Sequence, residues 1–175
     1  MTSHNTIDQA LKQLTYGFYI VATRKDGKEL TTRENDWVSA GTVSWATQSS
    51  FDPAMLTIAI QRESNLHETI GRSKSFSLTI LGQQDEALIK KFAENTNVDY
   101  SNNQVNGISY TEGKSGAPLL DCGIATIECE LAEMLNPENG DHILFVGKVI
   151  NAKQRNDDQA IIEANTRFEY AGTHN

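Results

Sequence analysis

The chain has 175 residues, a formal net charge of −8, 38% hydrophobic residues and 22% charged residues. This composition is typical of a globular protein, and the length fits one domain over residues 1–175. The negative charge, without a cluster of Lys and Arg, argues against nucleic acid as a partner. No apolar run approaches the ~20 residues that cross a bilayer, which argues against a membrane protein. Because the first residues lack the basic and apolar parts of a signal peptide, we expect a cytoplasmic protein.

The first part of the chain predicts two short helices with strands between them. Apolar residues at helical spacing over residues 7–14 predict an amphipathic helix that ends at Tyr16–Gly17. Asn65 as N-cap and Glu68 three residues later predict a second, brief helix that ends at Gly71. Four stretches between the helices are expected to be extended: Phe18–Thr23 (closed by a turn at 25–27), Trp37–Thr42, Trp45–Ser49 and Met55–Ile60.

Apolar and hydroxyl residues then alternate through Ser75–Leu81, which predicts a strand with apolar side chains on one face and hydroxyls on the other. An apolar stripe predicts a helix over Asp85–Ala93, and the polar, Asn-rich stretch Asn95–Gly107 is expected to be a loop.

The last part of the chain predicts a hairpin. Its strands are Ile124–Met134 and His142–Ala152, with the turn at Pro137–Gly140. Arg167–Tyr170 is expected to add an edge strand. On the first hairpin strand, Cys129 is expected to point inward and three polar residues outward: Thr126, Glu128 and Glu130.

The expected strands outnumber the helices, and turns join most of them. We therefore expect a mainly β protein with a largely antiparallel sheet, in a closed or nearly closed barrel with short helices at its ends. A doubly wound fold would need alternating helices that the sequence does not predict.

Short hydroxyl side chains crowd around one indole, Trp45, in the stretch 38–53. They belong to Ser39, Thr42, Ser44, Thr47, Ser49 and Ser50. Hydroxyls and free backbone N–H groups can hold phosphate oxygens, and an aromatic wall can flank a ring. The stretch favours a site for a ligand with a flat ring and an anionic tail. A Ser/Thr-rich loop between two strands is the alternative at this point.

Other motifs argue against several kinds of chemistry. Gly107–Ser115 ends like a phosphate-binding loop, but its spacing is one residue too long and no helix start follows. Cys122 and Cys129 match no zinc spacing, and the histidines form no pair at metal-ligand spacing, so we expect no metal site. His142 is either a surface turn residue or functional. Lys90–Lys91 is either a solvated helix face or a source of one anion-binding lysine.

From Ser44 to Pro53 the sequence resembles the flavin reductase-like family, whose members bind FMN in an antiparallel Greek-key split β-barrel. The resemblance runs in the family's order from about Leu11 to the C-terminus. It continues through 56–60, 64–70, 76–81, 90–93, 116–119, 140–142, 145–149 and 167–170. The chain departs from the family pattern at Ser39, at Ala54 and in a long segment at 31–36, which leaves cofactor preference and substrate access open.

The resemblance implies a set of site residues. The implied FMN-binding residues are Thr42, Ser44, Trp45, Ala46, Thr47, Arg62, Ser64, His67, Lys91, Phe168 and Tyr170. Among them, Lys91 would serve the phosphate. His142, in a Gly-Asp-His turn, would lie in the flavin and nicotinamide pocket as the candidate catalytic residue.

The implied activity is an NAD(P)H-dependent flavin reductase, an oxidoreductase that uses bound FMN, or FAD, to pass a hydride from a nicotinamide to flavin. The cofactors themselves perform this chemistry, so no dedicated general base is required. Family members are usually homodimers, and reduced flavin can serve a partner oxygenase or redox protein. Three alternatives stay open: a flavin-bound electron carrier, a pyridoxal-phosphate-type oxidase on the same barrel, and a barrel for another phosphorylated ligand.

Overall fold

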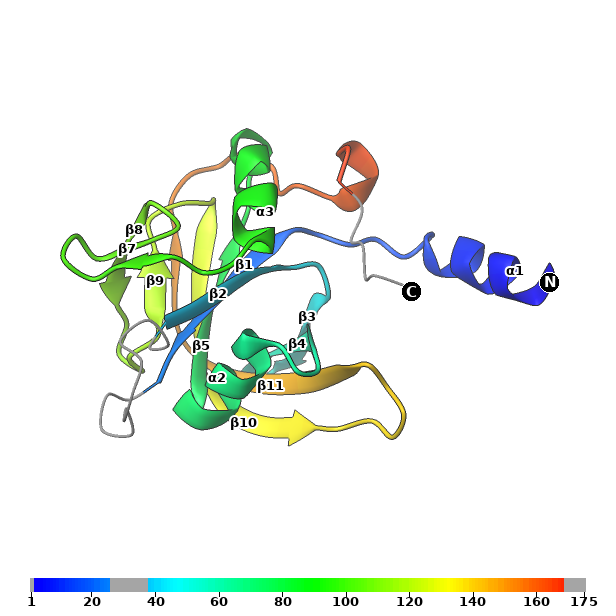
Figure 1. Cartoon of the computed structure of the whole chain (residues 1–175), viewed down its shortest axis with the longest axis horizontal. Coiled ribbons are helices and arrows are strands. Elements are labelled where there is room, and N and C mark those ends of the chain that lie inside the picture. Colours follow the sequence, from blue (N-terminus) through cyan, green and yellow to red (C-terminus); the bar gives the residue numbers. More distant parts are fainter. Residues whose placement is uncertain (1, 26–37, 169–175) are drawn as a thin grey trace.

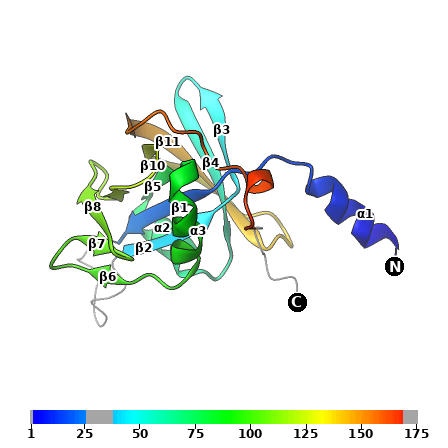
Figure 2. The same cartoon turned by 90° about the horizontal axis from the view of Figure 1, so that it is seen from above.

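The computed structural model describes residues 2–25 and 38–168. Its strands form one body, from which the first helix, α1 (Thr2–Leu11), projects (Figures 1 and 2). The expected turn at 25–27, the segment 31–36, Trp37 and Tyr170 lie wholly or partly outside the described residues.

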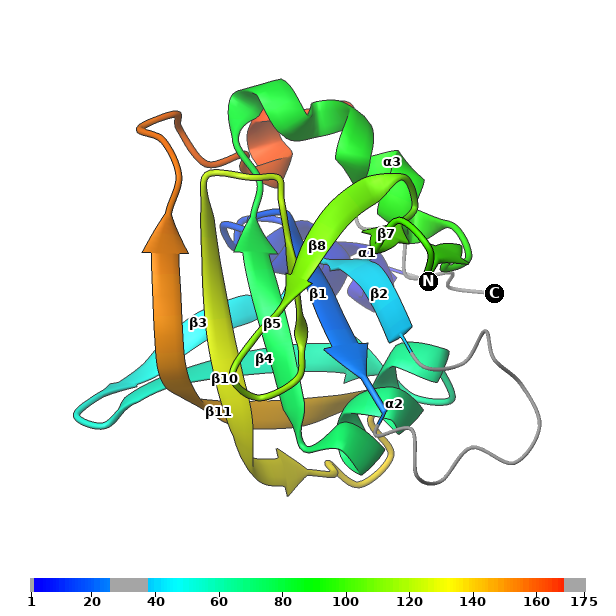
Figure 3. The ribbon, with the colours of Figure 1, turned by 90° about the vertical axis from the view of Figure 1, so that its left-hand side faces the viewer.

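Seven strands form one antiparallel sheet in the order β2-β1-β5-β10-β11-β4-β3. The sheet curls, so that β3 and β4 cross behind β5 and β10 in Figure 3. The mainly β, antiparallel fold is therefore confirmed, although the hydrogen-bonded order ends at β2 and β3 and does not close into a ring. The strands are β1 (Tyr19–Arg24), β2 (Val38–Val43), β3 (Ala46–Phe51), β4 (Ala54–Gln61), β5 (Ser75–Ile80), β10 (Ala125–Leu135) and β11 (His142–Gln154).

A second, four-stranded sheet covers part of the first. Its strands are β6 (Val98–Asp99), β7 (Gln104–Val105), β8 (Ile108–Glu112) and β9 (Pro118–Leu120). The expectation of a plain loop over Asn95–Gly107 was wrong, because β6 and β7 lie within it. Asn103 and Asn106 adopt left-handed backbone conformations with φ of 51° and 48°, which Asn tolerates and tight turns need.

Two apolar cores lie on opposite faces of β1. Ile20 and Ala22 pack into one core with α3 (Glu86–Ala93), while Val21 packs into the other with α2 (Asn65–Ser73). Because both faces are covered, β1 is apolar without alternation. Strand β2 borders both cores, with Ala40 in the first and Val43 in the second.

The boundaries of two predicted helices were wrong, and the described half of one predicted strand is not a strand. Helix α1 ends at Leu11, short of Tyr16. Helix α2 runs on to Ser73, and its N-cap is Ser64, not Asn65. Arg167 and Phe168 follow a short 3-10 helix (Glu163–Asn165) and form no strand. Both Ser and Asn are favourable caps, so residue type alone could not choose between neighbours.

The prediction that Thr126 and Glu128 face outward was also wrong. They are 3% and 1% exposed, because the β8–β9 pair covers this face of β10. Glu130, two residues further along, is exposed as expected, and Cys129 is buried. Alternation predicted which residues share a face, but a covering layer is a tertiary feature that alternation does not encode.

Candidate functional site

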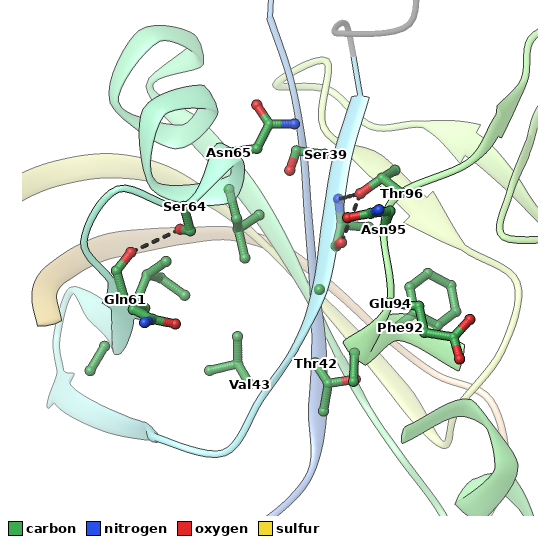
Figure 4. Close-up of a pocket in the computed structure, with 16 residues that line it drawn as sticks. Ser39, Thr42, Val43, Gln61, Ser64, Asn65, Phe92, Glu94, Asn95 and Thr96 are labelled. Carbon is green, nitrogen blue, oxygen red and sulfur yellow. Dashed lines mark hydrogen bonds between the residues drawn. The ribbon is translucent and has the colours of Figure 1, made fainter. Parts of the chain in front are cut away.

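A cavity of 430 Å³ lies beside β2, between the start of α2 and the end of α3. Figure 4 shows β2 crossing it, with Gln61, Ser64 and Asn65 on one side and Phe92, Glu94 and Thr96 on the other. Its walls combine apolar side chains, hydroxyls and carboxamides, as a site for a flat polar ligand requires. The lining residues are 39–43, 59–61, 64–66 and 92–96.

Strand β2 presents its backbone to this cavity because it is an edge strand. The N–H of Ala40 donates to Thr96 Oγ1 at 3.1 Å, and that hydroxyl donates to the Ala40 carbonyl at 3.0 Å. Backbone groups two residues apart point the same way, so those of Thr42 face the same open edge. The Thr42 hydroxyl donates to the Ile89 carbonyl at 2.8 Å and ties α3 to β2.

The N-terminus of α2 forms the opposite wall. Ser64 Oγ accepts from the His67 N–H at 3.1 Å and donates to the Gln61 carbonyl at 2.8 Å. This cap satisfies one of the first N–H groups of the helix and leaves its positive dipole end beside the cavity. The wall therefore favours electronegative ligand atoms.

A second, more open cavity of 670 Å³ adjoins the first, since Ala93, Glu94 and Asn95 line both. Lys91, Asn97 and Asn106 complete it. The exposed Lys91 ammonium lies near Gly107, where a Cβ would sit 3.5 Å from Nζ. Asn106 donates to the Lys91 carbonyl at 3.0 Å, which fixes this turn of α3. The lysine that the family resemblance assigns to the phosphate thus lines the cavity that adjoins the main one.

An aromatic cluster stands next to the main cavity. The Trp45 ring centroid lies 4.6 Å from that of His142 and 6.2 Å from that of Tyr16. His142 pairs with Gln61 across the β4–β11 ladder, so the cluster shares a sheet face with a cavity-lining residue. His142 is 9% exposed, and its Nδ1 lies 2.7 Å from Asp141 Oδ1. The carboxylate thereby orients the imidazole.

Arg62 holds the turn that carries His142. Its guanidinium donates to the carbonyls of Gly140 and Pro137, and its backbone N–H donates to the Asp141 carbonyl at 2.9 Å. Arg62 thus links β4 to the hairpin turn, and its role is to position the turn. The sequence could not show it, because the two segments lie more than seventy residues apart.

The other expected site residues occupy varied positions. Ser44 is buried, and its Oγ has no hydrogen-bond partner among the described residues. Thr47 is exposed on β3, and Ala46 is half-buried. The His67 ring lies 5.9 Å from Phe145, and Phe168 lines a separate cavity of 530 Å³ with Tyr16. Only Thr42 and Ser64 of the expected set line the main cavity.

Several lining residues were not predicted as site residues. Asn65 follows the predicted Ser64, Gln61 precedes the predicted Arg62, and Ser39 belongs to the hydroxyl run, so their neighbours gave a sequence signal. Glu94, Asn95 and Thr96 come from the segment expected to be a plain loop and reach the cavity only through the packing of α3.

The cysteines are not placed for nucleophilic chemistry. Burial raises the pKa of the Cys122 thiol to about 12, assisted by the Asp85 carboxylate, and the pKa of Cys129 to about 12, assisted by Glu128. Thiols need a lowered pKa to react as thiolates. Over residues 2–25 and 38–168, no three His, Cys, Asp or Glu side chains gather as a metal ion would need. No helix in these ranges is long and apolar enough to span a membrane.

Comparison with known proteins yields a family match. The model described as "Flavin reductase like domain" matches residues 11–172. The ferric-chelate reductase (NAD(P)H) of Archaeoglobus fulgidus is 24% identical over 158 residues, which are 89% of this chain and 86% of that protein. Diflavin flavoproteins of Nostoc sp. and Synechocystis sp. also match, but the chain spans only 22–24% of their length.

Solved structures show the same fold. The NADH:FAD oxidoreductase of Streptomyces globisporus superposes with a TM-score of 0.72 at 21% identity, covering 91% of this chain and 87% of that one. The flavin reductase component of a bacterial two-component tryptophan halogenase gives 0.73 at 19% identity, covering 91% and 92%. These matches confirm the family expected from the sequence, the fold class and the assignment to the oxidoreductases.

Proposed function

Because the chain belongs to the flavin reductase like family, we propose that it is an NAD(P)H-dependent flavin reductase that uses bound FMN to pass a hydride from a nicotinamide to flavin. The observation that carries this proposal is the cavity beside β2, which continues into the cavity that holds Lys91. An apolar wall suits the ring of a flavin, a polar wall suits its polyhydroxyl chain, and the nearby cation suits its phosphate.

The side chains and backbone of the site suit a flavin. Val43, Ile60 and Phe92 supply apolar surface, and the edge of β2 supplies N–H and C=O groups. Ser44 Oγ is a buried hydroxyl without a partner among the described residues, which costs about 1–3 kcal/mol unless a ligand atom or water satisfies it.

Each part of the ligand has a candidate partner. Lys91 would hold the phosphate, with the neighbouring carboxamides of Asn95 and Asn97. Thr42, Ser64 and Asn65 would face the ribityl hydroxyls, and Trp45 with Ala46 would flank the ring. FMN, when bound, supplies the hydride-accepting ring. FAD would use the same contacts and place its additional nucleotide in the open cavity.

The His142 side chain would make hydrogen-bonding and electrostatic contacts with the edge of the reacting rings. Its Nδ1 lies within hydrogen-bond distance of the Asp141 carboxylate, which orients the imidazole. Arg62 holds the turn in place, and Trp45 covers the imidazole and reduces its contact with water. These residues would position the rings at reacting distance, which is the main contribution a protein makes to hydride transfer.

We propose further that the chain works as a homodimer and delivers reduced flavin to a partner oxygenase. The apolar residues Ile7, Leu11 and Leu14 on and just after the projecting α1 are 52–56% exposed, a surface that a second copy would cover. A structural neighbour, the flavin reductase component of a two-component halogenase, supports the delivery of reduced flavin to a partner enzyme.

A flavin-bound electron carrier is the second candidate. The similarity to a segment of the diflavin flavoproteins favours it, because there the matching region is one part of a longer protein. A carrier would accept electrons from a protein donor and show little turnover with nicotinamides.

The deciding experiment is a visible spectrum of the purified protein reconstituted with FMN, before and after anaerobic addition of NADH or NADPH. We expect flavin absorption bands that bleach on addition, and steady-state nicotinamide oxidation with excess free flavin. Protein that binds FMN but shows no bleaching would establish the carrier instead. Protein that binds neither FMN nor FAD would refute both candidates.

A further inference from the structure

The cavity of 530 Å³ lies between the segment that joins α1 to β1 and the C-terminal 3-10 helix (Glu163–Asn165) with the residues after it. Figures 1 and 2 show this helix, coloured orange-red, beside the blue segment. The cavity shares no lining residue with the cavity beside β2, so the proposed flavin contacts leave it unexplained. Its lining residues are 12–16, 162–164 and 166–168.

Hydrogen bonds hold the two walls of this cavity in place. The Glu163 N–H donates to the Tyr16 carbonyl at 2.8 Å and joins one wall to the other. Thr166 Oγ1 accepts from the Phe168 N–H at 3.2 Å and donates to the Phe168 carbonyl at 3.0 Å, which fixes the backbone that carries this ring. Phe168 also packs against the first apolar core. The cavity is therefore anchored to the body of the protein.

Tyr16 connects this cavity to the aromatic cluster. Its ring centroid lies 6.2 Å from that of Trp45, and the Trp45 centroid lies 4.6 Å from that of His142. The Tyr16 hydroxyl donates to the Leu11 carbonyl at 3.3 Å, and this contact helps to orient the ring. A ligand that contacts Tyr16 in the cavity is thus two ring contacts away from His142, where we place the reacting rings.

The charged side chains of the cavity favour an anion. Lys12 and Arg167 supply two positive charges and Glu163 supplies one negative charge, so the lining is net positive in a chain of net charge −8. Arg167 is exposed, and its side chain forms no hydrogen bond or ion pair within residues 2–25 and 38–168. A guanidinium with available donors can bind a phosphate group through two N–H groups.

The other lining side chains favour a flat ring. Tyr16, Phe168 and Ile162 provide aromatic and aliphatic surface, and the cavity volume is within the range of about 300–1,000 Å³ that is usual for small-molecule sites. Leu14 is the only lining residue that also belongs to the surface proposed to be covered by a second copy. Ring surface beside an unpaired guanidinium matches a base that carries phosphate.

Building on the proposed function, we propose that this cavity binds the adenosine phosphate end of the nicotinamide coenzyme, so that the nicotinamide end reaches Trp45 and His142. The flexible ribose–diphosphate chain of a dinucleotide lets its two rings occupy separate places. Arg167 would bind the diphosphate with charge support from Lys12, and Phe168 would pack against the adenine. Binding energy from this remote end would help to hold the nicotinamide against the flavin.

Calorimetric titration with ADP-ribose, which lacks the nicotinamide ring, tests the site without turnover. The full chain is used in its native oligomeric state, with and without FMN. We expect wild type to bind ADP-ribose, and Arg167→Gln to bind it about tenfold more weakly because a charge-assisted contact is lost. Arg72→Gln makes the same charge change on an exposed part of α2 outside both cavities and should bind normally. The proposal would be overturned if wild type failed to bind at millimolar concentration, or if Arg167→Gln bound equally well.

Steady-state kinetics identify which coenzyme uses the cavity, because FAD also carries an adenosine phosphate. Arg167→Gln should raise KM for NADH about tenfold and leave kcat nearly unchanged, since it removes a contact made equally before and during hydride transfer. KM for reduced nicotinamide mononucleotide, which lacks the adenosine phosphate, should not change, and neither should the affinity for FMN or FAD.

Two contrary outcomes have different meanings. A loss of FAD affinity with an unchanged KM for NADH would assign the cavity to the flavin nucleotide and overturn this proposal. If NADH failed to reduce bound FMN in wild type, the proposed function would fail, while the ADP-ribose titration would still decide whether Arg167 marks an adenosine phosphate site.

Discussion

The strands β2 and β5 are both rich in hydroxyl side chains, but these side chains have different roles in the two strands. On β5, Ser75, Ser77 and Thr79 are all buried, because β9 packs over their face. Ser77 Oγ donates to the Pro118 carbonyl and thereby attaches β9 to the main sheet. On β2, Ser39 and Thr42 line a cavity instead.

The position of each strand in the sheet explains the difference. Strand β5 lies between β1 and β10, so both edges of its backbone are paired and both faces are covered. Strand β2 ends the sheet, and its outer backbone groups remain available to Thr96 and to a ligand. Hydroxyl density therefore indicates polar contacts, while an edge position decides whether a ligand can make them.

Filling the cavity beside β2 should have the largest effect. Gly41 lines it, and a Cβ there would meet Leu66 Cδ2 at an ordinary 3.5 Å, so Gly41→Leu should fold and project into the ligand space. We expect FMN affinity to fall about 100-fold or more, because the leucine side chain would occupy cavity volume that the ligand needs. Fluorescence quenching of FMN measures this.

Two matched controls accompany that variant. Gly41→Ala adds only the tolerated Cβ and should retain most of the affinity, and Gly71→Leu places the same side chain on α2, where a Cβ meets nothing within 4 Å. Unchanged FMN binding in a folded Gly41→Leu protein would show that β2 does not border the flavin.

Removing the cation at the end of the site should have a smaller effect. Lys91→Ala should weaken FMN binding about tenfold, the contribution of one charge-assisted contact to phosphate, and should leave riboflavin binding unchanged because riboflavin has no phosphate. Lys90→Ala, its exposed neighbour on α3, should affect neither ligand. Equal losses for FMN and riboflavin would contradict the placement of the phosphate at Lys91.

Much of this fold could be predicted from local patterns. The hairpin of β10 and β11 follows from two β-rich runs around a Pro-Glu-Asn-Gly turn, and β4 follows from the apolar run after Asp52–Pro53. The ordered resemblance to one family then gave the site residues Thr42 and Ser64, which do line the main cavity.

The remainder depends on contacts between distant segments. The far wall of the cavity, Glu94 to Thr96, reaches β2 through the packing of α3, and Arg62 reaches the carbonyls of Pro137 and Gly140. The burial of Glu128 likewise follows from the β8–β9 layer. Neither periodicity nor residue type contains this information, since each contact is decided by how layers stack.

The smallest effect on flavin binding is expected from the hydroxyls of β5. Ser77→Ala removes the hydrogen bond to the Pro118 carbonyl and leaves that buried acceptor without its hydroxyl donor, so we expect about 1–2 kcal/mol of lost stability in urea unfolding. FMN affinity of the folded variant should match wild type, because β5 lies behind β1 as seen from the cavity. Thr42→Val makes the reciprocal comparison on β2, where FMN affinity should fall. If Ser77→Ala weakened FMN binding as much as Thr42→Val, the contrast between an edge strand and a central strand would not explain where the ligand binds.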